Sequence, residues 1–304
     1  MSIQGSSFAK TAVFQAVPID SPSRRVLRQL RRRKLVMVCF GIIAFYIVLA
    51  ILGFLGVLPN YQVPVGEQYE APALEFAKLL GTDYLGQSVL YKILAGTKTA
   101  MLIGFCVTAI AIPIGVTLGA LAGYYGGFID NVVIWLYTVI SSVPYILMVI
   151  ALSYVFGKGL LAICLAMGLL GWVGLCRLIR GEVLKNRNLE YVLAAKAVGA
   201  NDAQIIFRHI LPNVIHLAII TGSLQILGAI KSEVILTYLG IGIQDGASWG
   251  IMISDATGEL VQGIWWPLAG VVLVMFLIIY ALNVVGDALR DALDPKLLDT
   301  NEDG

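Results

Sequence analysis

Six long runs of apolar residues follow one another along the chain, separated by shorter polar segments. A run of about 20 apolar residues crosses a bilayer as a helix, because a helix satisfies its own backbone hydrogen bonds in lipid. The pattern therefore predicts an all-α polytopic membrane protein with six transmembrane helices, the third of which is kinked at Pro144. The runs cover approximately residues 36–57, 99–122, 131–156, 160–176, 213–236 and 261–285.

The same pattern divides the chain into parts with different surroundings. We expect a cytosolic tail that ends in a basic segment (1–34), a first transmembrane helix (35–58), an extracytoplasmic segment (59–97), a five-helix core (98–296) with a cytosolic loop (181–212), and a C-terminal tail (297–304). The polar start and the long first apolar run argue against a cleavable signal peptide.

Composition agrees with a membrane location. Hydrophobic residues make up 59% of the chain and charged residues only 13%, whereas soluble domains carry about 25% charged residues. A net charge of +2 is too small to indicate a nucleic-acid partner, and the basic cluster at 21–34 is read as an anchor on the cytosolic face of the membrane. The cysteines are read as small apolar fillers: Cys39, Cys106, Cys164 and Cys176.

The positions of Lys and Arg orient the spans. Eight of them precede the first run, six lie in the loop after the fourth run, and two follow the sixth. The segments expected on the opposite side hold only Lys78, Lys92, Lys98 and Lys158. The positive-inside rule therefore places both termini in the cytosol, and membrane lipid surrounds the spans.

Polar groups within the apolar runs are candidates for a transport pathway. Gln225, Lys231 and Glu233 lie in the fifth run, where a charge at the helix centre costs about 2.5–3.5 kcal/mol. The two charged residues either face a cavity or reach the outer surface of the membrane. In the second run, Gly115, Gly119 and Gly123 form a smooth ridge, which is either a sliding interface or internal packing.

Motifs for chemistry are missing from the sequence. It contains no G-x-x-x-x-G-K-[ST] phosphate loop, no H-E-x-x-H and no G-x-S-x-G. His209 and His216 flank Pro212, and this break argues against a shared metal. We therefore predict no catalytic residue, no metal and no cofactor in this chain, and no nucleotide hydrolysis by the chain alone.

The stretch 193–212, LAAKAVGANDAQIIFRHILP, predicts two short helices bent at Gly199, with Pro212 ending the second or starting the next span. Small residues at its start would let another protein approach closely. Alternatively, it is an ordinary loop. The stretch resembles the EAA loop of ABC importer permeases, in which Ala194, Ala195, Gly199, Leu211 and Pro212 fall in register. Leu193 replaces the glutamate of the family, and His209 replaces an isoleucine, as is usual in the peptide-importer branch.

Four further motifs resemble those of the dipeptide/oligopeptide/nickel group of these permeases, and of its C-type subunit in particular. They are GTDYLG at 81–86, GYYGGFID at 123–130, YLGIG with SWG at 238–242 and 248–250, and GDALRDALDP at 286–295. Gln87 and Ser88 replace an Arg-Asp pair of the first motif. The resemblance covers approximately residues 35–296 and implies the type I importer permease (MetI-like) fold in a bacterial cytoplasmic membrane.

The resemblance also implies partners and roles. Members of this group pair with a second, similar permease, with two ATP-hydrolysing subunits, and with an extracytoplasmic substrate-binding protein, and they import peptides by alternating access. It implies that the EAA loop seats in the ATPase. We expect Gly81, Thr82, Asp83, Trp249 and Gly250 to form the surface met by the binding protein. The alternatives are a permease for nickel or another small ligand, an ion-coupled secondary transporter using Lys231 and Glu233, and a membrane-embedded enzyme.

Overall fold

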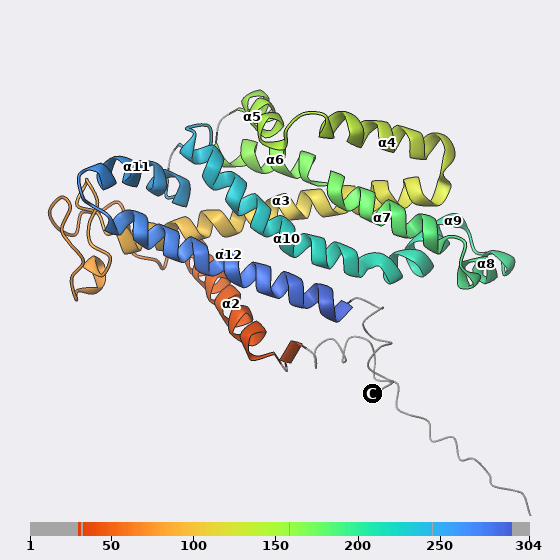
Figure 1. Cartoon of the computed structure of the whole chain (residues 1–304), viewed down its shortest axis with the longest axis horizontal. Helices are drawn as coiled ribbons and strands as arrows, with labels where there is room; N and C mark the ends of the chain where they lie inside the picture. The colour runs from red at the N-terminus through yellow and green to blue at the C-terminus, as the bar shows by residue number, and fades with distance from the viewer. Residues whose placement is uncertain (1–29, 32, 158, 245, 294–304) are drawn as a thin grey trace, which may run out of the picture.

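The chain folds into an elongated bundle of helices. The computed structural model describes residues 30–31, 33–157, 159–244 and 246–293 (Figure 1). Across these ranges, regular structure is helical apart from two isolated β-bridges, which confirms the all-α prediction. Most of the basic cluster at 21–34, the last two residues of the motif at 286–295, and the tail at 297–304 lie outside the described residues.

Five helical spans in the described part are long and apolar enough to cross a membrane. Two helices, α6 (Leu160–Gly171) and α7 (Val173–Asn186), together form one of these spans. The other four are α2 (Lys34–Phe54), α3 (Val89–Tyr125), α10 with the short helical turns before it (Asp202–Tyr238), and α12 (Trp266–Leu293).

The third apolar run folds differently from its prediction. It forms α4 (Gly127–Ser141) and α5 (Tyr145–Phe156), whose axes differ by 93°. Pro144 lacks an N–H, and it disfavours the helical conformation at the residue before it. The predicted kink is thus a right-angled break, so the pair is either one broken span or a re-entrant loop. The predicted count of six spans requires that α4 and α5 form one broken span.

Helix α3 is longer than predicted and organises the bundle. It starts ten residues before position 99, within the segment expected to be extracytoplasmic, and Ser88 caps it by accepting a hydrogen bond from the Tyr91 N–H. Its 37 residues span about 55 Å, well beyond the hydrocarbon thickness of about 30 Å. Helices α2, α6, α7 and α10 all pack against it.

The glycine ridge of α3 packs inside the subunit, against the backbone of α7. A Cβ on Gly119 would lie 2.7 Å from the carbonyl oxygen of Cys176, and one on Gly123 would lie 2.6 Å from that of Arg180. These distances are too short for any side chain. Of the two readings of the ridge, internal packing is therefore the one found, and α3 and α7 form one closely packed unit.

The two ends of the bundle carry different structures (Figure 1). One end carries α8 (Glu190–Ala197) and α9 (Asp202–Gln204). The opposite end carries the segment between α2 and α3, including the short turn η1 (Phe76–Lys78), and α11 (Trp249–Val261). Helix α11 was not predicted. Its cap is a local signal, because the Ser248 side chain accepts a hydrogen bond from the Gly250 N–H.

Candidate functional site

The loop at 181–212 folds as two short helices with a sharp turn between them. Helix α8 ends in a Schellman motif, in which the Ala200 N–H bonds the Ala195 carbonyl and the Gly199 N–H bonds the Lys196 carbonyl. Gly199 has a φ of +90°, which favours glycine. The predicted bend at Gly199 is therefore present.

The second short helix follows at once and leads into the next span. Asn201 and Gln204 form a capping box at the start of α9. A π-helical turn, η2 (Ile205–Ile210), connects α9 to α10 (Leu211–Tyr238). Pro212 stands in the first turn of α10, so it starts the next span rather than ending the loop.

The loop exposes apolar side chains to the surroundings. Leu193 is 52% exposed and Val198 is 89% exposed, and Phe207 of η2 is also exposed. Ala194 and Gly199 are exposed, whereas Ala195, His209 and Leu211 are half-buried. The loop therefore presents small and apolar groups that the described part of the chain does not cover, as a docking surface requires.

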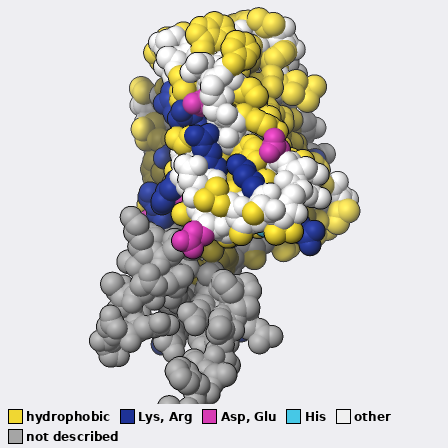
Figure 2. All heavy atoms as spheres, turned by 90° about the vertical axis from the view of Figure 1, so that its right-hand side faces the viewer, with side chains coloured by type: hydrophobic (Ala, Val, Ile, Leu, Met, Phe, Trp, Pro, Cys, Tyr) yellow, Lys and Arg dark blue, Asp and Glu magenta, His cyan; other side chains and the backbone are white. Residues whose placement is uncertain are grey.

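Other residues of the loop hold it on the bundle. Val192 of α8 is fully buried, and with Ile205 and Ile206 it belongs to a hydrophobic cluster that includes Ala120 and Tyr124 of α3. Lys and Arg side chains gather on the face of the molecule that carries α8 and α9 (Figure 2). The Lys and Arg residues of the loop at 181–212 are Lys185, Arg187, Lys196 and Arg208.

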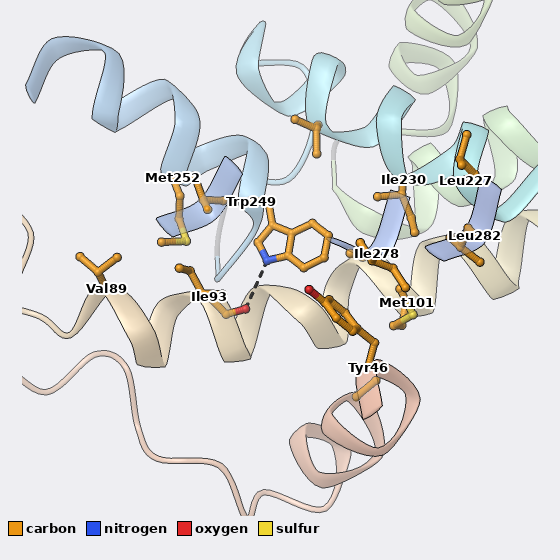
Figure 3. Packing of buried hydrophobic residues seen from close by; sticks show 14 residues of the cluster. Tyr46, Val89, Ile93, Met101, Leu227, Ile230, Trp249, Met252, Ile278 and Leu282 are labelled. Carbon is orange, nitrogen blue, oxygen red and sulfur yellow. Dashed lines mark hydrogen bonds between the residues drawn. The ribbon is translucent and has the colours of Figure 1, made fainter. Parts of the chain in front are cut away.

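At the opposite end, the residues expected to meet a binding protein are buried. Trp249 has no exposed surface, and its ring lies among Tyr46, Ile93 and Met252 (Figure 3). Its indole N–H donates to the Ile93 carbonyl at 3.2 Å. A Cβ on Gly250 would lie 2.6 Å from that of Thr237.

The motif at 81–86 is also held inside the protein by hydrogen bonds. Thr82 donates to the Glu67 carbonyl and accepts from the Glu70 N–H, and its own carbonyl accepts from the Trp266 indole at 3.1 Å. Asp83 is also buried. Gly81 has a φ of +73°, and a Cβ there would meet Trp266. These residues are buried, so they do not themselves form an exposed surface in this chain. Docking of a binding protein at this end of the bundle stays a prediction.

A crevice at this end of the bundle gathers three carboxylates around one ammonium. Asp83, Lys92, Asp255 and Glu259 line it, and Lys92 pairs with Asp83. Glu259 is 4% exposed, and its Oε1 atom has no hydrogen-bond partner among the described residues. Burial, with Asp83 and Asp255 nearby, raises the pKa of Glu259, and burial raises that of Asp255.

The three pathway candidates of α10 point in different directions. Gln225 lines a groove of about 470 Å³ with Tyr145, Gly171 and Ser232. Lys231 is exposed on another face. Glu233 is 1% exposed, and it accepts hydrogen bonds from Thr237 at 2.9 Å and Ser248 at 2.7 Å.

Both readings of Glu233 are therefore wrong. Its carboxylate neither faces a cavity nor reaches the outer surface, but joins the end of α10 to the start of α11 inside the protein. The hydroxyl groups of Thr237 and Ser248 make this burial possible, because a buried carboxylate needs hydrogen-bond donors.

Comparison with known proteins identifies the family of this chain. Residues 115–299 match the model of the binding-protein-dependent transport system inner membrane component. The chain belongs to this family. Residues 21–72 also match the N-terminal transmembrane domain of oligopeptide transport permease C. The resemblance drawn from the sequence motifs is thereby confirmed, and with it a multi-pass membrane permease of the ABC importer class.

Several known proteins are similar in sequence to this chain over most of its length. The dipeptide transport system permease protein DppC of Bacillus subtilis is 39% identical over 92% of this chain and 88% of its own length. The oligopeptide permease protein OppC of the same organism is 36% identical over 88% and 87%. The glutathione permease protein GsiD of Pectobacterium atrosepticum is 36% identical over 73% of each.

A solved structure of the MetNI methionine ABC transporter in inward-facing conformations is also similar. It has a TM-score of 0.49 and 17% identity, and the match covers 67% of this chain and 94% of the other. The three relatives named in the preceding paragraph are all permease proteins of transport systems.

Proposed function

We propose that this chain is the permease subunit of an ATP-driven importer that passes di- and oligopeptides across the bacterial cytoplasmic membrane. Its partners are a second, homologous permease, two ATP-binding subunits that hydrolyse ATP, and an extracytoplasmic substrate-binding protein. The relatives named for dipeptide and oligopeptide transport support the substrate class. The relative named for glutathione transport extends it to a small peptide derivative.

The observation that carries this proposal is the exposed loop formed by α8 and α9. It presents Leu193, Ala194 and Gly199 at the end of the bundle where basic side chains gather. By the positive-inside rule we assign that end, and with it both chain termini, to the cytosol. The loop is the coupling loop that contacts an ATPase subunit, and closure of the two ATPases opens the permease pair to the outside.

The test is uptake of labelled peptide into vesicles that hold the complete transporter. We expect uptake that requires ATP and both ATPase subunits, and that persists when ion gradients are collapsed. An ion-coupled secondary transporter would give the reverse pattern. Replacing peptide with nickel or another small ligand, each with its own binding protein, decides between the substrates of this group of permeases.

Gly199→Val tests the coupling loop itself. Valine is strained at a φ of +90°, at a cost of about 1–3 kcal/mol, so the turn between α8 and α9 changes shape. We expect peptide uptake and stimulated ATP hydrolysis to fall about tenfold or more, while insertion into the membrane is retained.

Gly263→Val is the matched control for backbone strain. Gly263 is exposed, has a φ of +87° and would meet no neighbouring atom through a Cβ, but it lies between α11 and α12. This variant should keep stimulated ATP hydrolysis close to the wild-type rate. Normal uptake by the Gly199 variant would overturn the assignment of the loop.

A further inference from the structure

Helix α3 contacts the region around Trp249 at one end of the bundle and the coupling loop at the other. Near its start, Gly96 lies under the Trp249 indole, and Thr99 donates to the Ala247 carbonyl at 2.8 Å. Near its end, Ala120 and Tyr124 support the coupling loop. Pro113 lies inside α3 and removes one backbone hydrogen bond, but the helix stays continuous over its 37 residues, so it can pass a displacement from one end to the other.

The Tyr124 side chain makes polar contacts with both short helices of the coupling loop. Its hydroxyl donates to Asp202 Oδ1 at 2.7 Å, and the Lys196 ammonium lies 5.2 Å from the centre of its ring. Lys196 belongs to α8 and Asp202 to α9, so one side chain contacts both short helices. Tyr124 is only 8% exposed, whereas Asp202 is exposed, so the hydrogen bond lies at the edge of the protein interior.

The end of α3 that carries Tyr124 is itself fixed. The Arg187 guanidinium donates to the carbonyls of Gly123 and Tyr124 at 3.2 and 3.1 Å, where the helix has its negative end. Two residues of the neighbouring helices, Arg180 and Asp130, form a two-bond ion pair beside it. Tyr124 is therefore held on the α3–α7 unit and reaches out to the loop.

We propose that Tyr124 is the positioning residue that transmits movement of the coupling loop to α3, which carries it as a rod to Trp249 at the outer end. This inference rests on the proposed function. The apolar contacts of Val192 hold the loop in place but are not directional, whereas the hydrogen bond to Asp202 has a fixed direction. The bond is therefore what makes loop and rod move together.

The test uses the complete transporter in nanodiscs and measures ATP hydrolysis with and without the substrate-loaded binding protein. Tyr124→Phe removes the hydroxyl but keeps the ring for Lys196. Asp202→Ala removes the acceptor, and Asp202→Asn keeps a neutral one. We expect the ratio of stimulated to basal rate to fall about fivefold or more in the first two variants, and far less in the third.

The control and the double variant separate transmission from simple support. Tyr125→Phe removes the hydroxyl of a neighbouring tyrosine that is 47% exposed, and it should keep the wild-type ratio. The double variant with Tyr124→Phe and Asp202→Ala should be no worse than either single variant, because both remove the same bond. A residue that only supports the fold would lower the basal and stimulated rates together and leave their ratio unchanged.

Hydrogen exchange of this chain in nanodiscs tests the contact without any partner. Tyr124→Phe should speed exchange of the amides of 190–204 and leave α10 unchanged. Unchanged exchange, or variant ratios equal to that of the wild type, would overturn the role of Tyr124. A wild-type complex that the binding protein does not stimulate would overturn the proposed function as well, so the two failures differ.

Discussion

Glu259 places a carboxylate in a crevice that already holds two others. Among the described residues that line the crevice, Lys92 of α3 is the one cation, and it pairs with Asp83 of the segment between α2 and α3. Asp255 and Glu259 lie one turn apart on α11. Like charges at this spacing destabilise a helix. Burial, together with the nearby charges of Asp83 and Asp255, raises the pKa of Glu259.

This arrangement predicts a pH-dependent stability. Because the pKa of Glu259 is higher in the folded than in the unfolded chain, folding takes up a proton, and the folded state loses stability as pH rises through the folded-state pKa. Glu259→Gln removes the charge, so we expect a higher Tm, by about 2–4 °C, at neutral to alkaline pH. The difference should vanish in acid. Tryptophan fluorescence of the full chain in nanodiscs measures it.

Glu75→Gln is the control, because Glu75 is exposed and lies in the segment between α2 and α3, at the same end of the bundle as Glu259. It should leave Tm unchanged at every pH. A Tm of the Glu259 variant that stays below that of the wild type in alkaline buffer would contradict the prediction, since the carboxylate would then stabilise the folded state.

Single residues also show how much of the site could be predicted from sequence. Gly199 could be identified because a glycine after a helical run marks a helix end. The bond between Tyr124 and Asp202 joins residues 78 positions apart, so no local pattern reports it. Trp249 was expected at the surface, because nothing local reveals that Gly96 leaves room for its ring.

At the scale of the elements, the close approach of α3 to α7 depends on the absence of side chains at Gly119 and Gly123. A Cβ on Gly119 would press on the backbone of Cys176, so Gly119→Ala must force the two helices apart. We expect this variant to lower the stability of the chain by about 1–3 kcal/mol. Thermal unfolding in nanodiscs, compared with the wild type, provides the measurement.

Gly181→Ala supplies the comparison. Gly181 lies within α7, and a Cβ there would meet no atom, so alanine should match or exceed the wild type in Tm, because it favours helix. If both variants had the same Tm, the close approach of α3 and α7 would not govern stability.

The sequence predicted helices well where the requirement to cross a bilayer is enough to define them. The apolar runs located α2, α10 and α12, because a bilayer selects long apolar helices. The same rule says nothing about direction, so it missed the 93° break between α4 and α5. It also missed α11, which is shorter than a span and packs on α10 and α12 instead of crossing lipid alone.

The whole molecule has an acidic crevice at one end and a basic face at the other, which predicts its orientation. In a chain whose four cysteines are replaced, Lys196→Cys should react with a membrane-impermeant thiol reagent only after cells are opened. Gln244→Cys, in the exposed turn between α10 and α11, should react in intact spheroplasts. The opposite pattern would reverse the orientation and would place the coupling loop outside the cell.

The partnership of α2 with α12 sets an order of assembly. Arg33 pairs with Asp291 at 2.8 Å, and the buried Tyr46 hydroxyl donates to the Val274 carbonyl at 2.6 Å. During synthesis α2 enters the bilayer first of these helices and α12 last. Until α12 arrives, the Tyr46 hydroxyl has no acceptor on its final neighbour. Insertion of α12, rather than that of α2, is therefore the moment at which this corner of the bundle can close.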